Sequence, residues 1–181
     1  MMRDPIVEFY RGQRPDAEGR LIDDIWSWDH ATLEAVHDYI QWLFPLRHAS
    51  GVNPDAPLIG PETIAAFEAD EALRARLVRS FELMLDFYGL ALERDPAGGF
   101  IVRTSAAFSE RSRNWLRPRN HNFLRITRIL TCLRTLGLPE HAATFFACLA
   151  GICDSGARDV VGDSFRFWRS AAGAASQGGH R

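Results

Sequence analysis

The chain lacks lysine altogether: all 21 basic residues in its 181-residue sequence are arginine. Without lysine it has no Walker-type phosphate loop, and it also lacks a GxSxG nucleophile motif and an HExxH or HxxxH metal motif. Its strongest paired-carboxylate signal is Asp23–Asp24. The sequence therefore offers no motif for a nucleophile, a phosphate site or a bound metal, and we expect no cofactor.

Cysteine is scarce. The three cysteines are Cys132, Cys148 and Cys153, and no two of them have CxxC spacing. An odd number at these spacings argues against a disulfide framework and against a structural zinc site. A reducing compartment fits this pattern best, and we expect a cytoplasmic protein.

Long hydrophobic runs are also missing. No stretch approaches the roughly 18 uncharged apolar residues of a membrane-spanning helix. The most apolar segment, residues 142–153, is shorter and predicts a buried helix. Charge begins at Arg3 and no apolar run of signal-peptide length follows. The formal net charge of −2 argues against a general nucleic-acid-binding protein.

Apolar residues recur at helical spacing along most of the chain. Asp29, Asp70 and Asn120 are the expected caps of three helices, because their side chains can accept hydrogen bonds from free backbone N–H groups. Pro45 ends the first of these helices, and Gly137 ends the third. The predicted helices cover residues 29–44, 61–70, 71–92, 105–116, 121–136, 139–152 and 157–171.

Residues 1–28 contain four glycine and proline breakers and are expected to be irregular, with Trp26 or Trp28 packed into the core. Only a short extended piece is expected, at residues 100–102. The connections are short and no internal repeat is present. The sequence thus predicts an all-α fold, with one compact domain of about six to seven helices over residues 1–171. A disordered tail is expected at residues 172–181.

Charge is unevenly distributed. Residues 111–134 contain seven arginines and no acid, whereas residues 1–40 contain nine acidic and four basic residues. Arginine presents a planar fork of donors that suits carboxylates and phosphates. The basic segment is either an anion site, best placed at the start of the helix after Asn120, or the internal partner of the acidic third. Because it lacks interleaved aromatic residues, we expect no nucleic-acid partner.

Several residues near these features are candidates for a site. His37 falls on the apolar face of the predicted 29–44 helix, which suggests a core histidine bonded to the backbone. Tyr39 and Trp42 lie off that face and need another helix or a ligand as a partner. His121 and Asn122 open the arginine-bearing helix, where they either contact a ligand or cap neighbouring chain ends. The last candidates are the arginines of this segment, Arg119, Arg125 and Arg128.

Residues 22–46, 72–92 and 117–138 resemble the conserved N-terminal domain of the opioid growth factor receptor family. The most specific segments are HDYIQWLFPL (37–46) and HNFLRITRIL (121–130), and their order matches the family. The resemblance covers about residues 6–150 and implies a helical domain without a transmembrane segment. Animal members are described as nuclear-associated receptors for the pentapeptide Met-enkephalin. The compact, lysine-free chain looks like a bacterial-type member without their C-terminal repeats.

We therefore expect a receptor-like domain that binds a short peptide or a small anionic ligand such as a carboxylate. Its aromatic and arginine groove would use Trp26, His37, Tyr39, Trp42, Arg119, His121, Asn122, Arg125 and Arg128. Two alternatives stay open. An enzyme of unrecognised class would use His37 and His121 as acid–base groups. A partner-binding module would present the 142–153 helix to another subunit. The sequence does not predict an oligomeric state.

Overall fold

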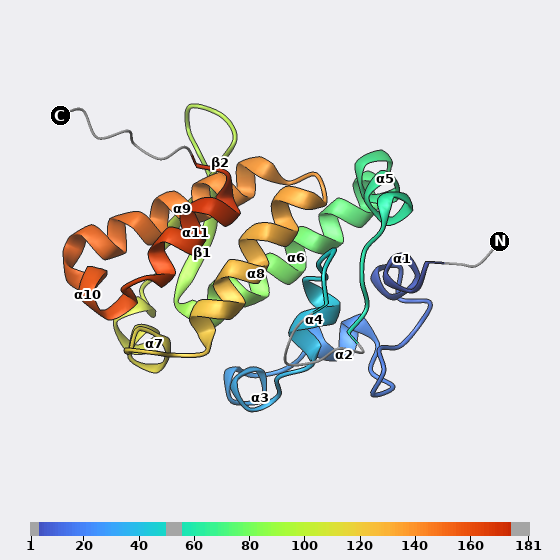
Figure 1. Ribbon diagram of the computed structural model, residues 1–181, viewed down its shortest axis with the longest axis horizontal. Coiled ribbons are helices and arrows are strands. Elements are labelled where there is room, and N and C mark those ends of the chain that lie inside the picture. The colour runs from blue at the N-terminus through green and yellow to red at the C-terminus, as the bar shows by residue number, and fades with distance from the viewer. Residues whose placement is uncertain (1–3, 50–55, 175–181) are drawn as a thin grey trace. The chain divides into compact units, whose positions relative to one another are not determined.

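The structure is a computed structural model of the chain, and it describes residues 4–49 and 56–174. These residues are mainly helical, as predicted, with one two-stranded sheet (Figure 1). They group into two compact units, residues 1–87 with 135–137 and residues 88–134 with 138–181. The single domain expected over residues 1–171 stays a prediction. Most of the expected tail, residues 175–181, and residues 51–55 of the predicted loop lie outside the described residues.

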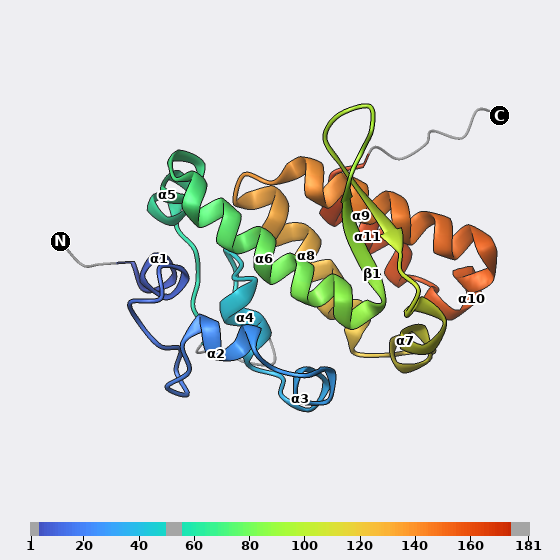
Figure 2. The same ribbon diagram turned by 180° about the vertical axis from the view of Figure 1, so that it is seen from behind.

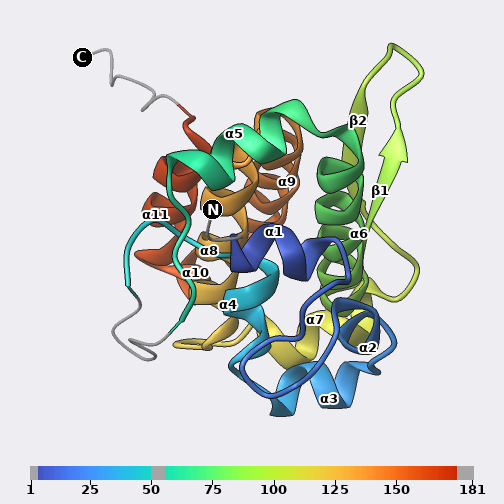
Figure 3. The same ribbon diagram turned by 90° about the vertical axis from the view of Figure 1, so that its right-hand side faces the viewer.

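The first unit is built from short helices and most of one long helix (Figure 3). These are α1 (Pro5–Tyr10), α2 (Ile22–Trp26), α3 (His30–Ala35), α4 (Tyr39–Leu43), α5 (Pro61–Ala69) and α6 (Glu71–Tyr88). The irregular segment expected over residues 1–28 is wrong, because it contains α1 and α2. Asp4 caps α1 by accepting hydrogen bonds from the N–H groups of Ile6 and Val7. The rings of Tyr10 and Phe67 pack edge to face with centres 5.2 Å apart, which packs α1 on α5.

The helix predicted over residues 29–44 is broken in two. Asp29 caps α3 as expected, but α3 ends at Ala35 and Val36 is extended, with φ −91° and ψ 138°. The Tyr39 hydroxyl donates a hydrogen bond of 3.0 Å to the Leu33 carbonyl. In a continuous helix that carbonyl would accept from the N–H of His37. The break reverses two expectations, since His37 is exposed and Tyr39 is fully buried.

A hairpin replaces the end of the helix predicted over residues 71–92. The long helix α6 ends at Tyr88, and Gly89 follows with φ +78°. The strands β1 (Leu90–Arg94) and β2 (Phe100–Thr104) then pair antiparallel, with Leu92 opposite Val102. The fold is therefore not strictly all-α. The reason is that glycine alone adopts a positive φ readily, so the chain turns there and apolar residues counted as helical enter a strand.

The second unit contains the hairpin and the C-terminal helices. These are α7 (Phe108–Trp115), α8 (Asn122–Thr135), α9 (Pro139–Ile152), the π-helical turn η1 (Cys153–Ala157), α10 (Arg158–Val161) and α11 (Ser164–Ala172). The described residues thus hold more helices than the six or seven expected. The Trp168 indole donates to the Phe123 carbonyl at 3.0 Å, which packs α11 on α8. The Val102 N–H donates to the Thr144 hydroxyl at 2.8 Å, which ties β2 to α9 (Figure 2).

The helix predicted over residues 139–152 is confirmed, and its apolar face is packed inside the unit. Phe145 and Leu149 are buried, and Phe146 stacks on Phe165 with ring centres 5.5 Å apart. Across residues 4–49 and 56–174, no helix has both the length and the apolar character that crossing a membrane requires.

Gly89 offers a test of this architecture. A Cβ there would lie 2.7 Å from the Phe108 Cα, and φ is +78°. Gly99 has a similar φ of +83° with nothing within 4 Å of the added Cβ. In both alanine variants a residue with a side chain must adopt a positive φ, which destabilises the fold. Only in Gly89→Ala does the added Cβ also clash with Phe108. We expect Gly99→Ala to lose about 1 kcal/mol and Gly89→Ala at least about 2 kcal/mol more in urea unfolding. Equal losses would show that Gly89 and Phe108 do not approach each other this closely at the hairpin entry.

Candidate functional site

Trp26, a predicted site residue, is seated on α6 in a fixed orientation. It ends α2, and its indole N–H donates to the Ser80 hydroxyl at 3.0 Å. Its side chain is 8% exposed, so only a small part of the ring reaches the surface. A buried indole normally satisfies its N–H in this way, and the bond fixes which part of the ring is presented outward.

Two arginines cover the Trp26 ring. Arg76 and Arg79 lie one turn apart on α6, and their guanidinium carbons are 4.6 and 4.1 Å from the ring centre. Asp23 of α2 faces the same pair, with N···O distances of 3.5 and 3.9 Å. The Arg76 Nε also donates to the Tyr10 carbonyl, so Arg76 is held in place. The Arg79 side chain is 59% exposed and the Arg76 side chain 31%, which makes Arg79 the cation that reaches solvent.

A hollow of about 210 Å³ opens at this point and is lined by Trp26, Arg79, Glu82 and Leu83. It brings together an aromatic wall, an apolar wall, a cation and a carboxylate. The sequence analysis missed Arg76, Arg79, Glu82 and Leu83, because it considered only the apolar stripe of this helix. Arg76, Arg79 and Leu83 follow the i, i+3, i+7 spacing of one helix face, and that spacing was the available signal.

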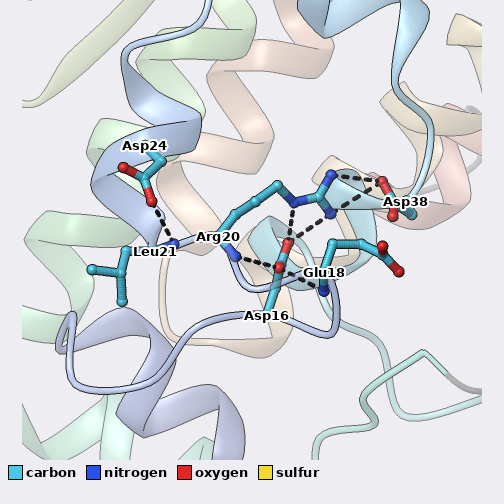
Figure 4. Close-up of polar contacts among 6 residues, drawn as sticks. All are labelled: Asp16, Glu18, Arg20, Leu21, Asp24 and Asp38. Atoms are coloured by element: carbon cyan, nitrogen blue, oxygen red, sulfur yellow. Dashed lines mark hydrogen bonds and ion pairs between the residues drawn. The ribbon is translucent and has the colours of Figure 1, made fainter.

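A second charged cluster in this unit is satisfied internally (Figure 4). The Arg20 Nε donates to Asp16 at 2.6 Å, and its Nη1 donates to Asp38 at 3.1 Å. The Asp16 side chain is fully buried and also accepts the backbone N–H groups of Glu18 and Arg20. Arg20 therefore ties the loop after α1 to the break before α4. We interpret the cluster as structural, because each partner is already engaged.

Arginines of the first unit thus pair with acids of the same unit. Arg11 is 3.2 Å from Asp70, and this hydrogen bond lowers the pKa of the Asp70 carboxyl. Asp70 also caps α6 as predicted, accepting from the Ala72 N–H at 3.0 Å. The acids of this unit that form these ion pairs therefore use arginines of the same unit. The pairing expected between the acidic third and residues 111–134 stays a prediction.

The other predicted residues of the first unit lie away from the hollow. Tyr39 is in the core, where its ring packs edge-on against Trp28 with centres 5.4 Å apart. Trp42 is half-buried and rests on Phe9, with ring centres 5.2 Å apart. His37 is exposed between α3 and α4. The partner that the sequence required for Tyr39 and Trp42 is therefore supplied by the domain itself.

In the second unit the predicted residues differ in exposure. Arg119 and His121 are exposed, whereas Asn122 is fully buried at the start of α8. Asn120 caps this helix by accepting the Asn122 N–H at 2.9 Å. Arg125 is 5% exposed and donates to the Asn122 side chain at 3.4 Å. The groove that would join these residues to Trp26, Tyr39 and Trp42 spans both units and stays a prediction.

Burial shifts the pKa values of the remaining candidate groups. It lowers the pKa of the half-buried Arg128 guanidinium and raises the pKa of the Cys132 thiol. Burial also raises the pKa of Cys148 to about 11 and lowers that of His141. All three cysteines are unpaired, and no group of histidine, cysteine or acidic side chains within residues 4–49 and 56–174 is arranged to hold a metal. None of these thiols has the low pKa of a nucleophile.

Residues 5–174 match the family model described as the opioid growth factor receptor (OGFr) conserved region. The chain belongs to this family. It is 46% identical to the opioid growth factor receptor of Rattus norvegicus over 143 residues, which are 76% of the chain and 24% of that protein. It is 44% identical to the Homo sapiens receptor, over 77% of the chain and 20% of that protein.

A second group of relatives is more distant. The chain is 36% identical to opioid growth factor receptor-like protein 1 of Mus musculus, over 72% of the chain and 28% of that protein. The chain therefore spans about a quarter of the length of the relatives that it matches. They are vertebrate proteins, so they give no support to the bacterial-type assignment. No solved structure matches the chain.

The raised thiol pKa values give a pH-dependent prediction. A thiol with a pKa of about 11 is almost entirely protonated at pH 8. Its thiolate fraction is then on the order of 100-fold below that of an ordinary cysteine, and it rises about tenfold per pH unit up to the pKa. We expect iodoacetamide to label the native protein slowly at pH 8, mainly at Cys148, the half-buried thiol, and faster as the pH rises. Peptide mapping would identify the labelled residue, with Cys148→Ser as the control and free cysteine as the rate standard. If any of the three thiols were labelled at the rate of free cysteine, the raised pKa of that thiol would be contradicted.

Proposed function

We propose that this family domain binds a short peptide through a carboxylate, at the hollow beside Trp26. The relatives are named receptors, and the name opioid growth factor receptor specifies a growth factor as what they receive. The observation that carries the proposal is the exposed Arg79 guanidinium, held 4.1 Å from the Trp26 ring centre at the edge of a hollow. An arginine set against an aromatic wall is a suitable receptor for a carboxylate beside an apolar side chain.

Each wall of the hollow has a separate task. Arg79 pairs with the ligand carboxylate, and the Trp26 ring and Leu83 contact an apolar side chain next to it. Glu82 provides an acceptor for an amide or ammonium group. The volume of about 210 Å³ is below the roughly 300–1,000 Å³ of pockets that enclose a whole small molecule. The hollow therefore holds one residue of a peptide, and the rest of the ligand lies across the surface.

Asp23 gives this proposal a distinctive consequence. Its carboxylate lies 3.9 Å from the Arg79 guanidinium, so it competes with a ligand carboxylate for the same cation. Removing the Asp23 charge should therefore strengthen ligand binding. A residue that only stabilised the fold would not have that effect.

The alternatives receive less support. An enzyme using His37 and His121 would need both in one cleft, and neither lines the hollow beside Trp26. The relatives are named as receptors rather than enzymes. A binding surface on the 142–153 helix is disfavoured, because the large apolar side chains of α9 are buried or half-buried. A small carboxylate metabolite would use the same Arg79 contact as a peptide carboxylate. We also expect a reducing compartment such as the cytoplasm, because the three cysteines are unpaired.

The test is calorimetric titration of the whole chain with Met-enkephalin and with the same peptide carrying a C-terminal amide. We expect Arg79→Gln to weaken binding of the free acid roughly tenfold or more, since one charge-assisted bond is lost. The amide should bind the native protein about as weakly as the free acid binds Arg79→Gln. Its affinity should fall little further in Arg79→Gln, because the amide has no carboxylate to lose. Asp23→Asn should tighten binding of the free acid. Arg14→Gln is the matched control, because Arg14 is an exposed arginine of the same unit that pairs with Glu8.

Two results would contradict the proposal. Equal affinities for the acid and the amide would show that no carboxylate is recognised. Unchanged affinity in Arg79→Gln, with a loss in Arg119→Gln or Arg128→Gln, would move the site to the arginines predicted from the sequence.

A further inference from the structure

The two units carry opposite charge, which the net charge of −2 conceals. Residues 1–87 with 135–137 contain eight arginines and sixteen acidic residues. Residues 88–134 with 138–181 contain thirteen arginines and seven acidic residues. An excess of cations of this size on one unit favours an anionic partner through long-range attraction. It does not by itself say where the partner binds.

The excess is concentrated at the corner between α7 and α8. Arg113, Arg117 and Arg119 are all exposed there, and residues 111–139 contain no acid. Among the described residues none of these three arginines forms an ion pair, whereas Arg103 pairs with Glu93 on the hairpin. The corner therefore presents three cations whose charge the unit does not neutralise.

The corner is a folded structure rather than a loose loop. The Asn120 side chain donates to the Asn114 carbonyl at 3.0 Å, and the Arg117 Nε donates to the Arg113 carbonyl. Beneath them Trp115 is fully buried, and its indole N–H donates to the Tyr88 carbonyl at 3.0 Å. Arg119 has φ +59°, a conformation that residues with a side chain rarely adopt. The arginines are therefore displayed from a fixed backbone, which lowers the entropic cost of binding a partner.

An exposed apolar side chain follows these cations closely in the chain, five residues after Arg119. Leu124, on the first turn of α8, is 72% exposed, more than any other large hydrophobic residue among those described. It is three residues after His121 and four before Arg128, so the three share one side of the helix. We call Arg113, Arg117, Arg119 and Leu124 the corner patch. It combines a cationic rim with a single apolar anchor point, which is the arrangement found at many protein–protein contacts.

We propose that the corner patch docks an acidic segment of a partner protein. Glutamate and aspartate side chains of the segment pair with Arg113, Arg117 and Arg119, and an apolar side chain packs on Leu124. A nucleic acid fits less well, because the patch exposes no aromatic ring on which a base could stack and Leu124 offers nothing to a phosphate. This surface shares no residue with the Trp26 hollow, and the proposal does not rest on the peptide binding proposed above.

The test measures fluorescence anisotropy of the whole chain with a labelled peptide made of glutamate and aspartate around a central Leu-Phe pair. A second peptide replaces that pair with serine, and labelled oligouridylate tests the nucleic-acid alternative. Arg117→Gln with Arg119→Gln should weaken binding of the first peptide roughly tenfold or more. Leu124→Ser should weaken the first peptide and leave the second unchanged. Leu124 is exposed, so this variant should keep its melting temperature.

The matched control is Arg94→Gln with Arg103→Gln, which removes two exposed arginines from the hairpin of the same unit. Retained binding in this control, with loss in the corner variant, supports the corner patch. An equal loss of affinity in both double variants would show that only the overall charge of the unit matters, and this would overturn the proposal. Tighter binding of oligouridylate than of the peptide, or no effect of Leu124→Ser, would overturn it as well. Binding of Met-enkephalin is measured on the same variants and should be unchanged.

Discussion

The hydrogen bond between the Trp26 indole and Ser80 is the interaction on which the candidate site depends. It fixes α2 on α6 with 3.0 Å between the two atoms, and it turns the remaining face of the ring toward Arg76 and Arg79. Once the ring is in place, the arginines can lie against it and share Asp23. The hollow beside it is therefore a consequence of how one buried donor is satisfied. A buried indole N–H without a partner would carry a large desolvation penalty, so this arrangement is strongly preferred.

Arginine is used in three physically different ways in this chain. Arg20 is engaged by a buried and a half-exposed carboxylate and holds the backbone. Arg79 lies on an aromatic ring and keeps most of its surface in solvent. Arg113, Arg117 and Arg119 are exposed on a fixed corner. The same guanidinium serves all three purposes because it stays charged, stacks on rings and donates several hydrogen bonds at once. Exposure distinguishes the arginines that we propose to bind a partner from Arg20, which is largely buried.

The chain belongs to the opioid growth factor receptor family, but it matches only a limited part of its relatives. The chain corresponds to about a quarter of their length. What the conserved region contributes to such receptors must come from surfaces within it. The Trp26 hollow and the corner patch are the two surfaces that we propose within it. Both offer arginine to carboxylates, the first at a small hollow beside an aromatic ring and the second through three exposed arginines.

The sequence by itself determined the helices whose ends are marked by strong local signals. Asp70 and Asn120 cap where expected, and α9 runs over the predicted residues because Gly137, Leu138 and Pro139 stop one helix and begin the next. The family was also readable, since long motifs in a fixed order survive in the chain. Trp26 was recognised because two indoles as close in the sequence as Trp26 and Trp28 rarely both stay exposed.

Only the tertiary structure decided which side chains became available. Tyr39 was a candidate for a ligand contact, yet its hydroxyl satisfies the Leu33 carbonyl and thereby breaks the predicted helix. Helical spacing alone could not show this, because the competing hydrogen bond comes from a side chain rather than from the next turn. The positive φ at Gly89 likewise converted the end of a predicted helix into a strand. Arg79 became the principal cation for the same kind of reason, since its role depends on a ring that the fold brings from residues more than fifty positions away.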